Sequence, residues 1–259
     1  MRKFIVLCLL LILPVAVAYA DTPLSILERI ERIHLTPWEV DLDPTLLDFT
    51  EAEVGDHITL GAYEQDNNPQ NGREPIEWRV LAKEDNRILV ISEYALDSVR
   101  YKRLQRNTSW KDCDLRQWLN HDFMEAAFNK HEKALIPIVT LSNEKNAKYK
   151  TSAGSDTQDR IFALSAKEAK RYFASDRERI CYPTAYALAQ GVHGREGGEP
   201  ALLGQCWWWL RTPGVDQNRA VVVYYGGHIN AAGNGVHRDN PGVRPAMWVQ
   251  LIHCDKRTP

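Results

Sequence analysis

Apolar and polar residues alternate along the first well-patterned part of the chain. Apolar Ile76, Trp78 and Val80 are separated by Glu77 and Arg79. Side chains on a strand point to opposite faces in turn, so this alternation predicts a strand with one face in a core and one partly in water. Similar patterns predict two neighbouring strands. We expect strands at His57–Tyr63, Ile76–Ala82 and Arg87–Ser92.

Three consecutive tryptophans open the most strongly patterned stretch, Cys206–Val249. On a strand, Trp207, Trp209 and Arg211 would share one face and Trp208 the other, so both faces must be covered. This pattern predicts a central strand, with Trp208 as an alternative stacking platform for a sugar or peptide. A hairpin turn is expected at Gly226–Gly227, a second turn at Gly233–Gly235 and a closing strand at Val243–Leu251.

Helical spacing and capping residues occupy the middle of the chain. Ser109 with Asp112, and Ser165 with Glu168, match the capping box that opens a helix. Helices are also expected at Glu132–Ile136 and Pro183–Gln190, and a polar surface excursion at Ser142–Arg160. Strands and helices in this order predict an α+β fold, a compact mixed domain with an antiparallel sheet and flanking short helices.

The first 20 residues have a basic start, a short apolar run and a small-residue ending at Ala20. This pattern is typical of a secretory signal peptide, and it predicts an extracytoplasmic protein, secreted or periplasmic, with no transmembrane segment in the mature chain. We expect residues 21–53 to form an N-terminal helix and connector, and residues 54–254 a single domain. The 32 basic and 34 acidic residues nearly balance, which argues against a nucleic-acid partner.

The cysteines outside the expected signal peptide are even in number and lack CxxC spacing, which in an exported protein favours disulfides over metal binding. We favour Cys181 with Cys206 and Cys113 with Cys254. The alternative is that Cys113 and Cys206 are buried free thiols.

Seven segments occur together in one order: GDHITLGAYEQDNN from Gly55, EPIEWRVL from Glu74, SWKDCDLRQWLN from Ser109, FALSAKEA from Phe162, PTAYALAQG from Pro183, WWWLRTPG from Trp207 and GVRPAMWV from Gly242. Over about Val54 to Ile252 the chain resembles a bacterial domain-of-unknown-function family, number 6273. The resemblance implies a secreted or surface location and no established activity. The order of elements also resembles the C-type-lectin-like fold of sulfatase-modifying factors.

No catalytic constellation is visible in the sequence, and we expect no cofactor and no metal site. Arg116, Arg211 and Arg244 follow apolar residues, so we expect them to be buried and paired, either with Asp112, Asp114, Asp216 or Asp239 or with loop carbonyls. Together with Trp207, Trp209 and the four cysteines, Arg116 and Arg244 are expected to be structural. Arg211 is also a candidate for capturing an anionic ligand.

Two functions remain open on the sequence. The first is a non-catalytic binding module that recognises a glycan, peptide or protein through its C-terminal loops. The second is an enzyme of the sulfatase-modifying-factor fold, in which Cys206 or Cys254 would be a reactive thiol. The candidate ligand contacts are Trp208, Arg211, Asp216, Asn218, Tyr225, His228, Asn230, Asn234 and Asp239.

Overall fold

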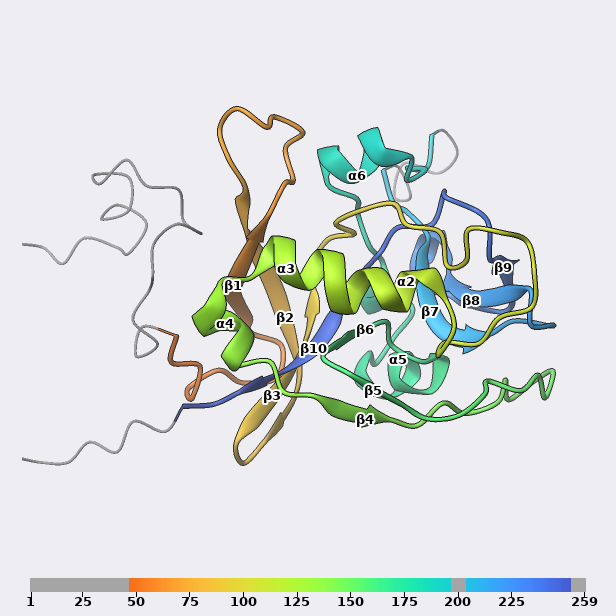
Figure 1. Cartoon of the computed structure of the whole chain (residues 1–259), viewed down its shortest axis with the longest axis horizontal. Helices are drawn as coiled ribbons and strands as arrows, with labels where there is room; N and C mark the ends of the chain where they lie inside the picture. The colour runs from red at the N-terminus through yellow and green to blue at the C-terminus, as the bar shows by residue number, and fades with distance from the viewer. Residues whose placement is uncertain (1–46, 197–203, 253–259) are drawn as a thin grey trace, which may run out of the picture. The chain divides into compact units, whose positions relative to one another are not determined.

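The structure, a computed structural model, describes residues 47–196 and 204–252 (Figure 1). The chain divides into two compact units, Met1–Leu35 and Thr36–Pro259, and all described residues belong to the second. The expected signal peptide, most of the predicted N-terminal extension and Cys254 lie outside the described residues.

A five-stranded antiparallel sheet with the strand order β1-β2-β3-β10-β6 forms the centre of the described domain. Its strands are β1 (His57–Tyr63), β2 (Glu74–Glu84), β3 (Arg87–Ser92), β10 (Ala246–Gln250) and β6 (Ile161–Phe162). The strand near the C-terminus therefore pairs with one of the earliest strands, with Trp248 opposite Leu89. The predicted α+β class and the three predicted N-terminal strands are confirmed, with β2 longer at both ends than expected.

The alternation of apolar and polar residues along β2 arises because one face of the strand lies in the core and the other is partly exposed to water. Ile76, Trp78 and Val80 are buried, whereas Glu77 between them is exposed. The indole of Trp78 donates a hydrogen bond of 2.7 Å to the carbonyl oxygen of Leu60 on β1. A buried indole N–H needs such an acceptor, so this bond lets a large aromatic side chain enter the core without an unsatisfied donor.

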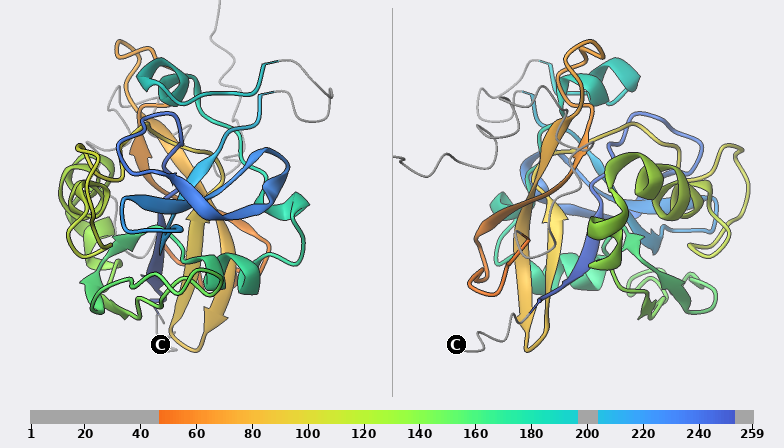
Figure 2. Two further views of the ribbon diagram at one scale, coloured as in Figure 1. Left: turned by 90° about the vertical axis from the view of Figure 1, so that its right-hand side faces the viewer. Right: turned by 60° about the vertical axis from the view of Figure 1, so that its left-hand side comes forward.

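Short helices lie against one face of this sheet (Figure 1, Figure 2). They are α2 (Asp114–Trp118), the π-helical η2 (Leu119–Phe123), α3 (Met124–Ala127) and α4 (Lys130–Ala134). Phe123 and Phe128 join this group to the sheet, because the Phe128 ring stacks on Trp78 and the Phe123 ring meets Tyr63 edge-on. No helix in the described ranges is long and apolar enough to cross a membrane.

The first predicted capping box is wrong and the second is confirmed. Helix α2 begins one turn later than expected, and its N-cap is Cys113, whose sulfur accepts a hydrogen bond from the amide of Arg116. Ser109 donates instead to the Asp112 carboxylate. The capping box of Ser165 and Glu168 opens α5 (Ala166–Tyr172) as predicted. The predicted helix before Gly191 is confirmed as α6 (Ala185–Gln190).

The tryptophan stretch forms a second antiparallel sheet at the end of the domain that faces the viewer in the left view of Figure 2. Its strands are β7 (Trp208–Pro213), β8 (Arg219–Val223) and β9 (Ile229–Gly235). The middle strand is β8, so the prediction that the tryptophans occupy a central strand is wrong. Strand β7 is nevertheless buried, because its free side hydrogen-bonds with other segments, from Trp209 to Gly242 and from Arg211 to Leu164.

The hairpin between β8 and β9 turns at Gly226–Gly227, as predicted, through the short helix η5 (Tyr225–Gly227). Gly227 has a φ of +83°, and a Cβ there would lie 1.6 Å from the carbonyl oxygen of Asp176, so only glycine fits. The second predicted turn, at Gly233–Gly235, is wrong, because these residues continue β9.

The predicted surface excursion, Ser142–Arg160, contains one short strand, β5 (Thr157–Asp159), which pairs with β4 (Val139–Leu141) immediately before the excursion. Asp159, at the end of β5, is buried and accepts hydrogen bonds from the Trp110 indole and from Thr157. Sequence periodicity cannot reveal strands of three residues. A further short helix, η3 (Arg177–Arg179), precedes Cys181.

Candidate functional site

The three arginines that we expected to be paired have partners in the structure, but the acids predicted for them are wrong. Backbone carbonyls, the other predicted kind of partner, accept from all three guanidiniums. Arg211 is 3% exposed and forms a bidentate ion pair with Glu168 of α5. Burial alone would raise the pKa of Glu168, but the hydrogen bonds and charge of Arg211 outweigh it and lower the pKa. Arg211 therefore ties β7 to α5, and a buried guanidinium that already holds a carboxylate is a poor candidate for ligand capture.

Arg116 and Arg244 likewise pair with acids outside the predicted set. The Nε of Arg116 lies 2.5 Å from Asp159. Arg244 is 1% exposed; its Nε donates to the Ser92 carbonyl, and its Nη2 lies 3.7 Å from Glu93. Both residues join segments far apart in the sequence.

Trp208 is fully buried, with its indole donating to the carbonyl of Arg179 and its ring next to Phe173 and the Arg244 guanidinium. A ligand could reach this ring only by opening the core. The burial therefore favours the structural role over the stacking role.

Tyr225, His228 and Asn230 lie together around the η5 turn, where they adjoin two further aromatic residues. The centroid of the Trp207 ring lies 4.2 Å from that of the Tyr224 ring and 5.3 Å from that of the Tyr225 ring. Asn230 donates to the Tyr224 hydroxyl at 2.7 Å. The three candidates thus adjoin one aromatic cluster of Trp207, Tyr224 and Tyr225, in which His228 is exposed and packs edge-on against Tyr224.

The other loop candidates mainly shape their own turns. The Asp216 carboxylate accepts from the amide of Asn218 at 3.2 Å, and Asn234 accepts from the amide of Gly235 at 2.9 Å. Asp and Asn commonly stabilise turns in this way without any ligand.

Asn218 and Asp239 differ from the other loop candidates because they contact a distant part of the chain. The segment Ser98–Thr108 lies along the C-terminal loops that carry them. The amide of Thr108 donates to the carbonyl of Gln217 and the amide of Lys102 to that of Val236. The Arg100 guanidinium lies 2.7 Å from the Asp239 carboxylate, and Gln105 donates to Asn218. Residues some 110 to 140 positions apart in the sequence are thereby fixed side by side.

A cavity of about 700 Å³ opens beside this segment. Four basic residues, Arg100, Lys102, Arg103 and Arg106, line it together with Ser98, Val99, Leu104, Asp114, Gln117, Trp118, Asp122, Gln190 and Asp239. The cavity therefore combines one half-buried indole, several amide and hydroxyl groups, and a basic segment. Its volume lies in the range of ligand pockets, but most of its lining is charged or polar, whereas ligand pockets are usually lined by apolar side chains.

Two of the four basic residues of the cavity form ion pairs and the other two do not. Lys102 pairs with Asp114 at 2.6 Å, and Arg100 pairs with Asp239. The hydrogen bond from Arg100 lowers the pKa of Asp239, so that carboxylate stays ionised. Within the part of the chain that the structure describes, the guanidinium groups of Arg103 and Arg106 have no ion pair or hydrogen bond, and both side chains are exposed.

The basic segment was not among the predicted site residues, although the sequence carries a signal for it. The run RYKRLQR from Arg100 to Arg106 carries four basic residues in seven positions. Such a run is often a solvated surface, and only its contacts with the C-terminal loops show that it lines a cavity.

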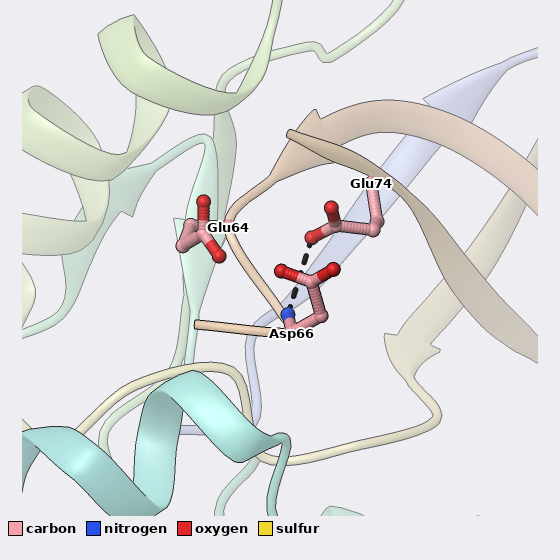
Figure 3. A group of neighbouring side chains, drawn as sticks. All are labelled: Glu64, Asp66 and Glu74. Carbon is pink, nitrogen blue, oxygen red and sulfur yellow. Dashed lines mark hydrogen bonds between the residues drawn. The ribbon is translucent and has the colours of Figure 1, made fainter. Parts of the chain in front are cut away.

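A separate group of carboxylates lies in the loop between β1 and β2 (Figure 3). Glu64, Asp66 and Glu74 each place one oxygen within 4.8 Å of the others. These oxygens also accept hydrogen bonds from loop amides; Glu74, for example, accepts from Gln65 at 2.6 Å. The bonds shape the loop and account for the convergence of the side chains.

The cysteines that the structure describes, Cys113, Cys181 and Cys206, are buried free thiols. The predicted disulfides are therefore not seen, and Cys254 lies outside the described residues. Cys113 caps α2, whereas the backbones of Cys181 and Cys206 are joined by a hydrogen bond of 2.9 Å.

Comparison with known proteins gives one result. No curated protein and no solved structure matches the chain. A family model described as a domain of unknown function, DUF6273, matches residues 85–251. Strands β1 and β2 precede the matched residues, although they belong to the same sheet as β3. Because the match covers more than half of the chain, the protein belongs to the DUF6273 family.

Proposed function

We propose that this protein is an exported, non-catalytic binding module that captures an acidic glycan or peptide in the cavity lined by the basic segment Arg100–Arg106. The single observation that carries this proposal is the cavity of about 700 Å³ in which the guanidinium groups of Arg103 and Arg106 make no ion pair or hydrogen bond among the described residues, although the charge of Arg103 helps to lower the pKa of Asp114. The ligand supplies the carboxylates or other anionic groups that these two guanidiniums lack.

Guanidinium groups suit this task, because their planar N–H donors match the two oxygens of a carboxylate. Arg100 and Lys102 are already neutralised by Asp239 and Asp114, and they hold the segment in place. Trp118 offers a half-buried aromatic surface next to these charges, on which a sugar ring or an apolar side chain can rest.

The state of Cys206 supports a binding function over an enzymatic one. Its thiol is 1% exposed, and burial raises its pKa well above the ordinary value, helped by the neighbouring Cys181. A buried, protonated thiol is a poor nucleophile towards a substrate that must reach it from solvent.

Export and a lectin-like architecture belong to the same proposal. The N-terminal pattern that ends at Ala20 supports export, and export would bring the cysteines into a compartment where disulfides form. The order of helices, tryptophan strand, hairpin and closing strand supports the architecture, since β10 returns to pair with β3.

The test is a binding screen of the purified protein against an array of glycans, peptidoglycan fragments and peptides, in which each carboxylated member has a neutral counterpart. We expect binding to carboxylated members, and a marked decrease between about 50 and 200 mM salt because the contacts are ionic and exposed. The double variant Arg103→Ala/Arg106→Ala should lose this binding. Arg177→Ala, which removes an exposed arginine that does not line the cavity, is the matched control.

A second variant, Tyr225→Ala, examines the aromatic cluster at the η5 turn. If binding depends on Tyr225 and not on the two arginines, the site lies in the cluster and the cavity proposal is wrong. Equal binding of carboxylated and neutral counterparts would also contradict it.

A further inference from the structure

Cys181 and Cys206 come together in the core from segments on either side of α6. The amide of Cys206 donates to the carbonyl of Cys181 at 2.9 Å, and each thiol shifts the pKa of the other. Bridges from Ala95 to Pro183 and from Gly194 to Cys206 fix the two backbones next to these residues. Each cysteine is 1% exposed, so both sulfur atoms are confined in one small space.

We propose that Cys181 and Cys206 are a dithiol that is oxidised to a disulfide, which closes a covalent loop of about 25 residues around α6. The hydrogen bond between the two backbones holds the two residues next to each other, and a disulfide requires cysteines placed as closely as this. This inference is independent of the ligand proposed for the cavity.

The two sulfurs are chemically unequal. Burial alone would raise the pKa of Cys181, but the hydrogen bond with Cys206 and the positive charge of Arg244 outweigh it and lower the pKa. Burial and the neighbouring Cys181 raise the pKa of Cys206. Cys181 is therefore the sulfur that becomes a thiolate, and thiolates are the attacking species in thiol–disulfide exchange.

Arg244 is the buried cation beside the two cysteines, and its charge lowers the pKa of both. Its guanidinium is fully buried between the rings of Trp208 and Phe173, and Nη1 and Nη2 have no hydrogen-bond partner among the described residues. Its nearby acid, Glu93, is also bound by Arg79 through two hydrogen bonds. Because Arg244 shares its one nearby carboxylate with Arg79, its positive charge is only partly balanced, and a thiolate beside it is therefore favoured.

The oxidation is balanced with a disulfide, such as oxidised glutathione, as the oxidant. The Cys181 thiolate attacks one glutathione sulfur, forming a mixed disulfide and releasing a glutathione thiolate. Cys206 then loses its proton and attacks the Cys181 sulfur, which forms the protein disulfide and releases the second glutathione. One glutathione disulfide is reduced to two thiols as the two protein thiols are oxidised.

Cys113 provides a matched comparison in the same chain. It is as deeply buried as the pair, but burial raises its pKa to about 12, and its sulfur caps α2 through the Arg116 amide. We expect it to stay a thiol.

The test refolds the reduced, purified full-length protein in a glutathione buffer, traps remaining thiols with iodoacetamide in denaturant, and maps the peptides by mass spectrometry. We expect a Cys181–Cys206 linked peptide and alkylated Cys113. Reductant should lower the unfolding midpoint by roughly 10 °C, the effect of opening a loop of this length. Cys113→Ser should keep this response, and Cys181→Ala/Cys206→Ala should lose it.

Single variants test the order of attack. Cys206→Ser should accumulate glutathione on Cys181, whereas Cys181→Ser should accumulate little on Cys206. Recovery of Cys181 and Cys206 as alkylated free thiols, or a bond from either of them to Cys113 or Cys254, would overturn the proposal. A reductant response that persists in the double alanine variant would also overturn it.

Discussion

Replacing Trp209 by alanine should lower the free energy of unfolding by about 3 to 5 kcal/mol, the usual range for deleting a buried aromatic side chain. Trp209 is 1% exposed, and its ring lies 5.6 Å from that of Tyr101. Its indole donates to the carbonyl of Val99 at 3.1 Å, so the substitution leaves a cavity and also removes a hydrogen bond from a partly buried acceptor. We therefore place the effect in the upper part of the range.

Equilibrium unfolding in urea, followed by tryptophan fluorescence and far-ultraviolet circular dichroism, measures this loss. With a slope of about 3 kcal/mol/M, the midpoint should fall by about 1 to 2 M. Trp248→Ala is the matched control, because Trp248 is only partly buried and stacks against Arg87, so its removal should cost less. A loss below about 1 kcal/mol for Trp209→Ala would refute the reasoning and place this side chain outside the core.

Three further predictions concern the N-terminus, the ion pair of Arg211 with Glu168, and the hairpin asparagines. N-terminal sequencing of protein recovered outside the cytoplasm should begin after Ala20, and an intact N-terminus would contradict export. Because Arg211 lowers the pKa of Glu168, that pair should stabilise the fold above the ordinary carboxyl range and lose its effect as the pH falls through the lower, folded-state pKa. Acid titration of stability should therefore show a smaller acid-dependent loss in Glu168→Gln; an unchanged profile would contradict the pair's role. Asn230→Ala/Asn234→Ala should change acidic-ligand binding little, because neither residue lines the cavity, and loss of binding in a folded variant would move the site to the hairpin.

Elements set by residues close together in the sequence could be predicted from the sequence. The strand around Trp78 was predictable because its alternation matches a half-buried sheet, and α5 because Ser165 and Glu168 both make the capping-box hydrogen bonds. The start of α2 was predicted wrongly, because Ser109 and Asp112 bond to each other and the cap is a cysteine sulfur. No periodicity distinguishes that arrangement from a capping box.

The partner of Arg211 and the location of the candidate site depend on contacts between residues far apart in the sequence, which the sequence alone does not reveal. Arg211 was expected to be buried and paired, but its partner Glu168 lies 43 residues away and was not among the predicted acids. The candidate loops were chosen for their Asn, Asp and Gly content, which turns need whether or not they bind anything. Of the candidate ligand residues, Asp239 lines the cavity, and it does so beside Arg100 from a distant segment.

The account's central claim is that Arg103 and Arg106 hold an acidic ligand in the cavity beside Trp118. The most direct measurement is calorimetric titration of the wild type and of Arg103→Ala/Arg106→Ala with the strongest carboxylated member of the array and with its amidated counterpart. Each charged hydrogen-bond contact is worth about 1.5 to 3 kcal/mol, so the account predicts that the variant, or loss of the ligand's charge, weakens binding by a factor of more than about ten. Equal affinities of wild type and variant for the carboxylated ligand would contradict it.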